Sequence, residues 1–441
     1  MQKPLIAVLI TSAFLTLNAQ AADLIQVYQQ ALANDATYAG ARSSLAAGQE
    51  RITQGRSGLL PVISASGSNT RNSGDSTQVQ EITGIRFQGD TKYHTNTYTV
   101  ALTQPLINWG AWQTYQQSKL SQASAEATFS QAQQDLIVRV AQAYFDVLTA
   151  QDNLTATQAQ KVATTEQLAS AKRNFEVGTQ TITDTHEAQA AYDLVVAQEF
   201  AAINDLDNKR TALQVIVGQT PGELAPLRTG VTIAPPSPAA VDPWISSAES
   251  QNYAVVAAGL NVEIAKREIS RNRANHLPTA NLIASNSHQN QTGANGGTVN
   301  NNAIGVSWSI PIFNGFAVTS KVRETIALEE KARNDLEATK RAASQTARQA
   351  FLGMTSGLAQ VKALEAAEVS SKSSLDSNKL GYQVGVRINI DVLNAQKLLY
   401  STQKDLSKAR YDTIMNGLRL KSAAGSLREE DLGPVNALLA R

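Results

Sequence analysis

The sequence predicts an α+β membrane protein in which long helices continue from a small set of β-strands. Three observations predict this class: an internal duplication, two long proline-free intervals with helical spacing, and short segments with strand-like alternation. The chain has 441 residues, aromatic residues make up only 5% of it, and Cys is absent. We therefore expect thin helical layers stabilised by packing and by association of copies, without disulfides.

The first residues have the composition of an export signal. Lys3 precedes an apolar run from Leu5 to Leu17, and residues 19–21 form a small-x-small cleavage pattern. Residues 1–21 are therefore predicted to be a signal peptide that is removed. An uncleaved anchor is the weaker alternative, because the run is shorter than the roughly 20 residues that span a bilayer. Since no later segment has that length, the exported chain would enter a membrane only as a closed barrel.

The chain consists of two similar halves. At one constant offset, a set of residues in the first half recurs in the second: Phe175, Gly178, Asp184, Ala188 and Gln189 correspond to Tyr382, Gly385, Asp391, Ala395 and Gln396. Repeats of this kind place equivalent groups around a pseudo-symmetry axis. The duplication therefore indicates a wall of a ring or channel.

Two intervals predict very long helices. Proline is absent between Pro105 and Pro221 and between Pro311 and Pro434, so nothing there breaks a helix. Apolar residues recur at alternating steps of four and three, as in a coiled-coil seam: Leu136, Val140, Ala143, Val147, Ala150 and Leu154, and again Ala347, Phe351, Met354, Leu358 and Val361. A helix from about Trp109 to residue 175 would be roughly 100 Å long, too long for a compact domain. Small seam residues favour a curved layer of helices, and an isolated coiled-coil stalk is the alternative.

Period-two alternation predicts strands in four places. Ile304, Val306 and Trp308 alternate with Gly305 and Ser307, and the strands are expected near residues 60–70, 93–105, 278–288 and 302–313. Four strands cannot close a membrane barrel, which begins at about eight. Two copies would form a narrow barrel filled by side chains. Three copies would form a twelve-stranded barrel with a lumen, which is the arrangement that we expect.

Aromatic residues gather near the ends of the predicted strands: Trp109, Trp112, Trp308, Phe313 and Phe316. Such a cluster is typical of the girdle at a membrane interface, and the core of a soluble sandwich is the alternative. The segments 74–90 and 289–300 are then expected to be outward-facing loops.

Composition argues against other classes. The net charge is +1, so the basic face of a nucleic-acid binder is not expected. The four His residues lie far apart, and no nucleophile elbow or paired-carboxylate motif is present. We therefore expect no enzyme, no catalytic residue, no cofactor and no metal site. A periplasmic adaptor with helical hairpins and a passive porin remain as alternative functions.

Several blocks in order resemble one family. The two half-repeats, the strand pairs between prolines, residues 26–31 and residues 381–387 resemble TolC-type outer-membrane efflux and secretion channels over nearly the whole mature chain. The resemblance implies a homotrimer with a twelve-stranded outer-membrane barrel, a periplasmic tunnel of twelve helices and a mixed equatorial belt. The helical barrel would comprise residues 22–59, 109–217, 246–276 and 315–424, the strand hairpins residues 60–108 and 277–314, and the belt residues 218–245 and 425–441.

The resemblance also implies a function. The protein would be an exit duct in the outer membrane of a Gram-negative bacterium, surrounded by outer-membrane lipid and extending into the periplasm. It would dock to a periplasmic adaptor (membrane fusion) protein and to an inner-membrane pump of the RND or ABC type. Drugs, other small molecules and secreted proteins would leave the cell through it, as in multidrug export and type I secretion.

A closing latch is expected where each long helix turns back. By resemblance, Tyr382 and Arg387 on one side and Thr183 and Asp184 on the other link neighbouring helices at the periplasmic end. Such a latch can be opened, because a partly exposed ion pair contributes only about 0–1 kcal/mol. The alternative is local: Gly178 would end one helix, and Asp184 would complement the dipole of the next.

Asp391 is expected to face the pore. Asp391 and Asn394 lie one helical turn apart, so three-fold symmetry would stack them as two rings at a constriction. The family commonly has aspartate at both positions. Since Asn394 replaces one of them, the constriction is expected to bind multivalent cations less tightly.

Overall fold

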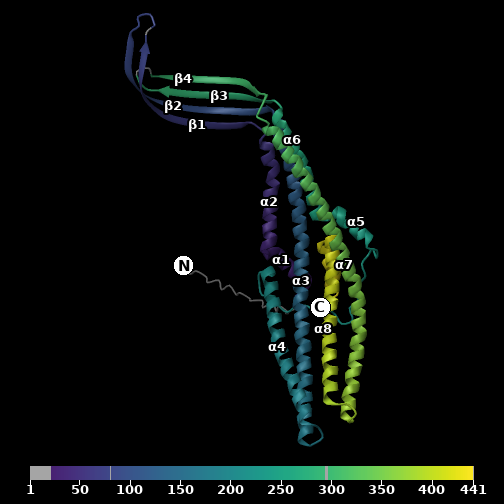
Figure 1. Ribbon diagram of the computed structural model, residues 1–441. Helices are drawn as coiled ribbons and strands as arrows, with labels where there is room; N and C mark the ends of the chain where they lie inside the picture. The colour runs from purple at the N-terminus through teal and green to yellow at the C-terminus, as the bar shows by residue number, and fades with distance from the viewer. Residues whose placement is uncertain (1–20, 80, 294–295, 441) are drawn as a thin grey trace, which may run out of the picture. The chain divides into compact units, whose positions relative to one another are not determined.

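The computed structural model describes residues 21–79, 81–293 and 296–440 (Figure 1). Residues 1–20 of the predicted signal peptide lie outside the described residues. The chain divides into two compact units. One comprises Met1–Gly40, Ala132–Asn252 and Ala343–Arg441, and the other comprises Ala41–Gln131 and Tyr253–Ala342.

The second unit contains a four-stranded antiparallel sheet, which confirms the predicted number of strands. Figure 1 shows its strands side by side in chain order: β1 (Val62–Val79), β2 (Arg86–Ile107), β3 (Thr279–Gln291) and β4 (Gly297–Ser309). The strands are longer than predicted, since β1 and β2 occupy most of the expected loop at residues 74–90. Pro105 lies inside β2, where the pairing with β3 shifts register between Pro105 and Ile107. A proline cannot donate to the ladder, so it is tolerated at such an irregularity.

The strand register gives the sheet two different faces. Cross-strand pairing places Ile63, Leu102, Ala284 and Ile304 in one row, because each is the partner of the next. The adjacent row, whose side chains point to the opposite face, consists of Ser64, Ala101, Ser285 and Ala303. One face is therefore apolar, and the other carries small and polar side chains.

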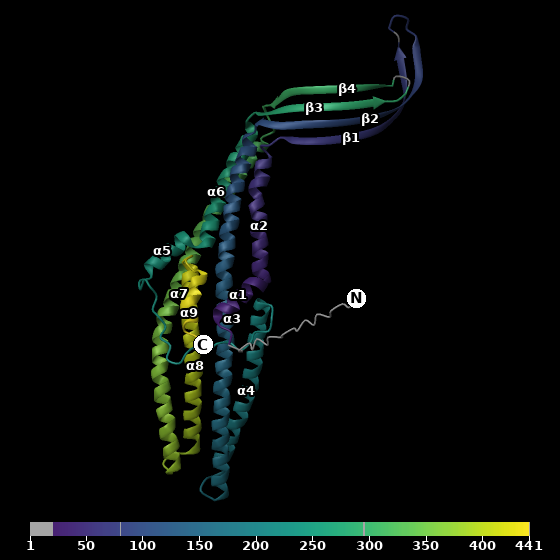
Figure 2. The ribbon, with the colours of Figure 1, turned by 180° about the vertical axis from the view of Figure 1, so that it is seen from behind.

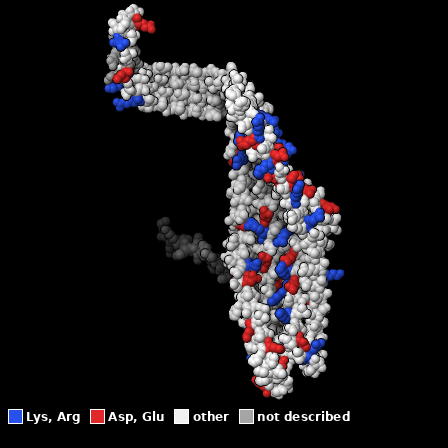
Figure 3. Space-filling model, in the orientation of Figure 1, with Lys and Arg blue, Asp and Glu red and all other residues white. Residues whose placement is uncertain are grey.

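Charged side chains are confined to one end of the sheet. No Lys, Arg, Asp or Glu occurs in residues 279–309, and those of the first hairpin lie toward its turn. On the face drawn in Figure 3, charged side chains cover the helices and the far strand ends, while the rest of the sheet is without them. The predicted aromatic girdle is also exposed: Trp109 is 49% exposed and Trp308 is 72% exposed, so these residues are not the core of a sandwich.

The same unit contains α2 (Ala36–Ser57), α6 (Tyr253–Arg273), the single turn η1 (Ala274–His276) and the first parts of α3 (Trp109–Glu176) and α7 (Ala317–Gln383). Helices α2 and α3 approach closely, because a Cβ atom at Gly48 would lie 2.4 Å from the Cβ of Ala125. Gln117 of α3 donates to Glu268 of α6 at 2.9 Å. Among the described residues, no helix has both the length and the apolar character needed to cross a membrane.

The first unit is built on two antiparallel helical hairpins. Figure 2 shows α3 beside α4 (Ile182–Val217) and α7 beside α8 (Asn389–Ala423), and the short α1 (Leu24–Asn34) packs into the same core. The predicted seam residues are buried here: Leu136 and Val140 are 0% exposed, and Ala347 of the second copy is 0% exposed. The coiled-coil spacing therefore identified the packed faces correctly. At Gly357 a Cβ would lie 2.4 Å from the Thr413 hydroxyl, so α7 and α8 need a glycine at this position.

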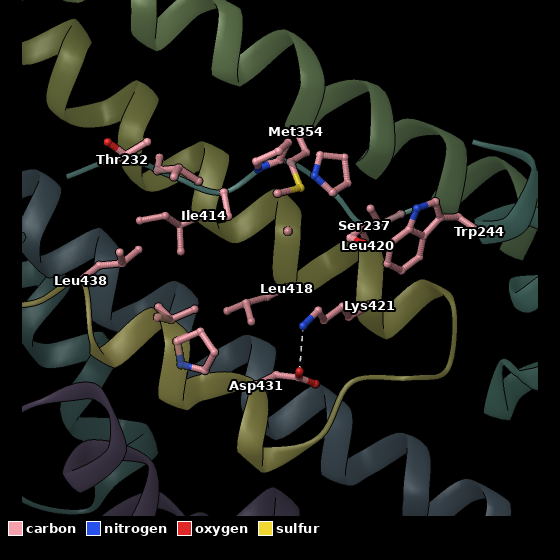
Figure 4. A pocket seen from close by; sticks show the side chains of 17 residues that line it. Thr232, Ser237, Trp244, Met354, Ile414, Leu418, Leu420, Lys421, Asp431 and Leu438 are labelled. Atoms are coloured by element: carbon pink, nitrogen blue, oxygen red, sulfur yellow. Dashed lines mark hydrogen bonds and ion pairs between the residues drawn. The ribbon is translucent and has the colours of Figure 1, made fainter. Parts of the chain in front are cut away.

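The connector and the tail form an irregular layer on these hairpins. A parallel bridge joins Ala22 to Leu224, and an antiparallel bridge joins Leu227 to Leu439. The layer includes α5 (Asp242–Gln251), which begins inside the predicted connector, the single turn η2 (Glu429–Asp431) and α9 (Leu432–Asn436). A cavity of about 300 Å³ lies in it. Trp244, Met354 and Leu418 contribute apolar side chains to its wall (Figure 4). At its edge Lys421 and Asp431 form an ion pair at 2.7 Å.

One carboxyl group is held inside the hairpin core. The Tyr411 hydroxyl donates to Asp152 at 2.9 Å. Burial raises the pKa of Asp152 above its ordinary value near 3.8, although hydrogen bonds from Tyr411 and Ser407 act against this. Folding therefore favours the protonated carboxyl. Its contribution to stability is fully present below that ordinary value and is lost as the pH rises through the raised pKa.

We therefore expect Asp152→Asn to stabilise the protein at neutral pH. The amide oxygen still accepts from Tyr411, but no charge has to be buried. Differential scanning calorimetry should show an unfolding midpoint about 2–4 °C higher at pH 7. The difference should shrink below about pH 4, where both side chains are neutral. An equal or lower midpoint at pH 7 would show that other interactions in the fold offset the cost of burying the ionised Asp152 carboxylate.

Candidate functional site

The turn between α3 and α4 is shaped by its own sequence. Gly178 has a φ of +76°, a left-handed conformation that ends α3 without the penalty of a Cβ. Thr181 caps α4: its hydroxyl accepts from the Asp184 backbone N–H at 3.3 Å and donates to the Asp184 carboxylate at 2.8 Å. Within the chain, the main side-chain contacts of Asp184 are therefore local ones with the capping residue at the start of α4.

The turn between α7 and α8 repeats this design with less capping. Gly385 has a φ of +79°, and the backbone N–H groups of Val386 and Arg387 donate to the Gly381 carbonyl. Ile388 precedes α8 and has no capping side chain. Arg387 lies 3.7 Å from Asp391, and their side chains are 58% and 34% exposed. The guanidinium therefore has room for another acceptor.

Tyr382 connects the two turns. Its hydroxyl donates to the Gln180 side chain at 2.9 Å and accepts from Asn174 at 3.4 Å. Asn174 lies in the last turn of α3 and Gln180 in the turn that follows. The tyrosine therefore contacts the expected hairpin, but through residues close to Thr183 and Asp184 and not through these two. Thr183 is exposed, and within the described chain no bond joins Tyr382 or Arg387 to Thr183 or Asp184.

Two hydrogen bonds of one buried side chain deeper in the hairpins were not predicted. Asn389, which is 0% exposed, accepts from Gln167 of α3 at 2.6 Å and donates to the Asp184 carbonyl of α4 at 2.9 Å. It therefore joins the start of α8 to both helices of the other hairpin. An asparagine at a helix start is read from sequence as a cap, so only its depth in the fold reveals this role.

The two expected constriction residues lie in the first turns of α8. Asp391 is half-buried and Asn394 is exposed, one helical turn apart as expected. Asn394 also lines a cavity between the hairpins. Among the described residues, no group of three or more His, Asp or Glu side chains is arranged to hold a metal ion.

Comparisons with known proteins agree with this architecture. Residues 27–219 and 244–426 match the family described as outer membrane efflux protein. The outer membrane protein TolC of Vibrio cholerae is 34% identical, over 99% of this chain and 98% of its own length. The alkaline protease secretion protein AprF of Pseudomonas aeruginosa is 32% identical, over 95% of this chain and 88% of its own.

A solved structure shows the same fold at lower identity. The outer-membrane channel OprN superposes with a TM-score of 0.79 and 18% identity, over 91% of this chain and 90% of its own. The matches in sequence and fold extend over nearly the full length. They confirm the resemblance that rests on the half-repeats and on residues 26–31 and 381–387. The chain belongs to the outer membrane efflux protein family.

Proposed function

We propose that three copies of this chain assemble into an outer-membrane exit duct, with their sheets joined into one twelve-stranded barrel. The observation that carries this is the sheet itself. Its edge strands β1 and β4 each pair on one side only within the described sheet, and its apolar row from Ile63 to Ile304 runs from edge to edge. Closure with further copies would pair both edges and place the apolar face in lipid.

The opposite face then lines the lumen. Its small and polar side chains, such as Ser64 and Ser285, suit a water-filled passage. The helical hairpins would continue this passage into the periplasm, with the connector and tail as a belt around them. The duct would receive drugs, small molecules and secreted proteins from an inner-membrane pump of the RND or ABC type through a periplasmic adaptor.

Assembly and conductance test this function directly. Protein extracted from outer membranes should migrate as a trimer on a gel without heating, as a monomer after boiling, and should pass current in a planar bilayer. A periplasmic adaptor would be absent from the outer membrane and would pass no current. A stable monomer in detergent that forms no pores would contradict the proposal.

We also propose that the α7–α8 turn closes the periplasmic end. Within one chain Tyr382 already holds this turn to Gln180, while Arg387 and Thr183 remain exposed. In the trimer Arg387 would reach Thr183 and Asp184 of the neighbouring copy. Asp391 would then form the narrowest ring, and Asn394 beside it would leave three carboxylates in place of six, which weakens block by multivalent cations.

The double variant Tyr382→Phe with Arg387→Ser is expected to raise the single-channel conductance of the resting protein several-fold. Two hydrogen bonds of the Tyr382 hydroxyl, each worth about 0.5–1.5 kcal/mol, and one exposed pair of about 0–1 kcal/mol would be lost in each copy. Planar-bilayer recording measures this, with Lys362→Ser, an exposed position on the same hairpin, as the control. Equal conductance in both variants would show that Tyr382 and Arg387 do not hold the pore closed.

A further inference from the structure

A second cavity lies between the two hairpins, close to the α8 start. Its volume is about 260 Å³, and three helices line it: α3 with Gln160 and Thr164, α4 with Leu194 and Gln198, and α8 with Lys397 and Lys404 among others. All of these residues belong to the first unit of the chain. Of the residues that the proposed gate uses, Asn394 also lines this cavity, but its lysines and Gln160 have no role in the gate.

The cavity has an excess of positive charge. Two lysines line it, and no carboxylate does. Lys404 donates to the Thr157 hydroxyl at 2.8 Å, and no ion pair joins it or Lys397 to an acid within the described chain. Other lysines on the same helices are paired: Lys161 contacts Glu199 at 2.6 Å, and Lys408 contacts Asp412.

Partial burial makes the charge of Lys404 costly. It lowers the pKa of Lys404, and nearby Asp405 only partly opposes the effect. A half-buried ammonium group without a counter-charge is stabilised when an anion binds beside it. The cavity is therefore electrostatically suited to an anionic ligand.

An amide without a partner in the chain adds a second observation. Gln160 is 9% exposed and lines the cavity, and its side-chain amide makes no hydrogen bond within the described chain. Its polar atoms are not fully buried, so they can bond to a molecule in the cavity. The remaining wall is apolar, with Ala191, Leu194, Val195, Ile390 and Leu393. A ligand would therefore present an acidic head to the lysines and Gln160, and an apolar body to the rest.

We propose that this cavity binds a small organic anion, a carboxylate with an apolar body, through Lys397, Lys404 and Gln160. The ligand contacts α3 and α4 of one hairpin and α8 of the other at the same time. If the two hairpins separate on opening, the ligand favours the state in which they are together. The binding site itself does not depend on the proposed duct function.

Fluorine-19 NMR of the full chain purified in detergent tests the proposal. The probe is 4-(trifluoromethyl)benzoate. Its uncharged analogue 4-(trifluoromethyl)benzamide measures how much of the affinity remains when the carboxylate charge is absent. The benzoate should bind more tightly than the benzamide. Lys397→Met and Lys404→Met should each weaken benzoate binding by about tenfold, since each removes one charge-assisted hydrogen bond.

Lys408→Met is the matched control, because Lys408 lies one turn beyond Lys404 on α8 and outside the cavity lining. It should leave benzoate binding unchanged. Equal binding of benzoate and benzamide, or equal binding to the control and to Lys397→Met, would overturn the proposal. The exposed position of Lys397 keeps this test valid if Lys404→Met fails to fold. Because the readout is binding and not current, it stays separate from a failure of the duct proposal.

Discussion

Val306→Arg is expected to remove most of the protein from the outer membrane. Val306 lies on the apolar face of the sheet in β4, opposite Leu282 of β3, and is 59% exposed. In the proposed trimer this face meets lipid, where an arginine near the bilayer centre costs about 2–4 kcal/mol. Each barrel would contain three such residues, so the assembled form should be lost. Heat-resistant trimer in outer-membrane fractions measures this.

Ser307→Arg is the matched control for this prediction. Ser307 follows Val306 and points to the opposite face, opposite Asn281. If that face lines a water-filled lumen, the same arginine is hydrated there and the trimer should form at nearly normal yield. Equal loss in both variants, or equal assembly, would contradict the assignment of the two faces.

Asn389→Leu is expected to lower the unfolding midpoint and to raise resting conductance. The leucine is similar in size, but it leaves the buried Gln167 amide without its partner and removes the side-chain bond to the Asp184 carbonyl. The unsatisfied amide alone costs about 1–3 kcal/mol. Because the lost bonds join the start of α8 to the other hairpin, the closed arrangement should be destabilised together with the fold. Calorimetry and planar-bilayer recording on the same preparation measure both effects.

Asn378→Leu provides the comparison for a local asparagine. Its amide bonds only to Ser374 on the same helix, and its side chain is half-buried. Neither the midpoint nor the conductance should change in this variant. A normal midpoint in Asn389→Leu would show that Gln167 finds another partner. A lower midpoint with normal conductance would assign Asn389 to stability alone.

Periodic features were predictable because they depend on local geometry. The steps of four and three placed Leu136, Val140 and Ala347 on buried seams, and α3 extends over the predicted length. Alternation around Ile304 and Val306 identified β4 for the same reason, because side chains of a strand point to opposite faces in turn. Strand ends were less predictable: the mostly polar segment 74–79 continues β1, since pairing with β2 satisfies its backbone groups.

Sequence patterns alone were enough to identify the half-repeats, the helical seams, the number of strands and the family. They also placed Tyr382 and Arg387 where α7 ends and the chain turns back into α8. The packing of the hairpins was needed to show that Tyr382 contacts Gln180, that Asn389 bridges three helices, and that Lys397 and Lys404 share a cavity with Gln160. Periodicity depends on neighbours along the chain, whereas these contacts join residues far apart in sequence and depend on how the hairpins pack.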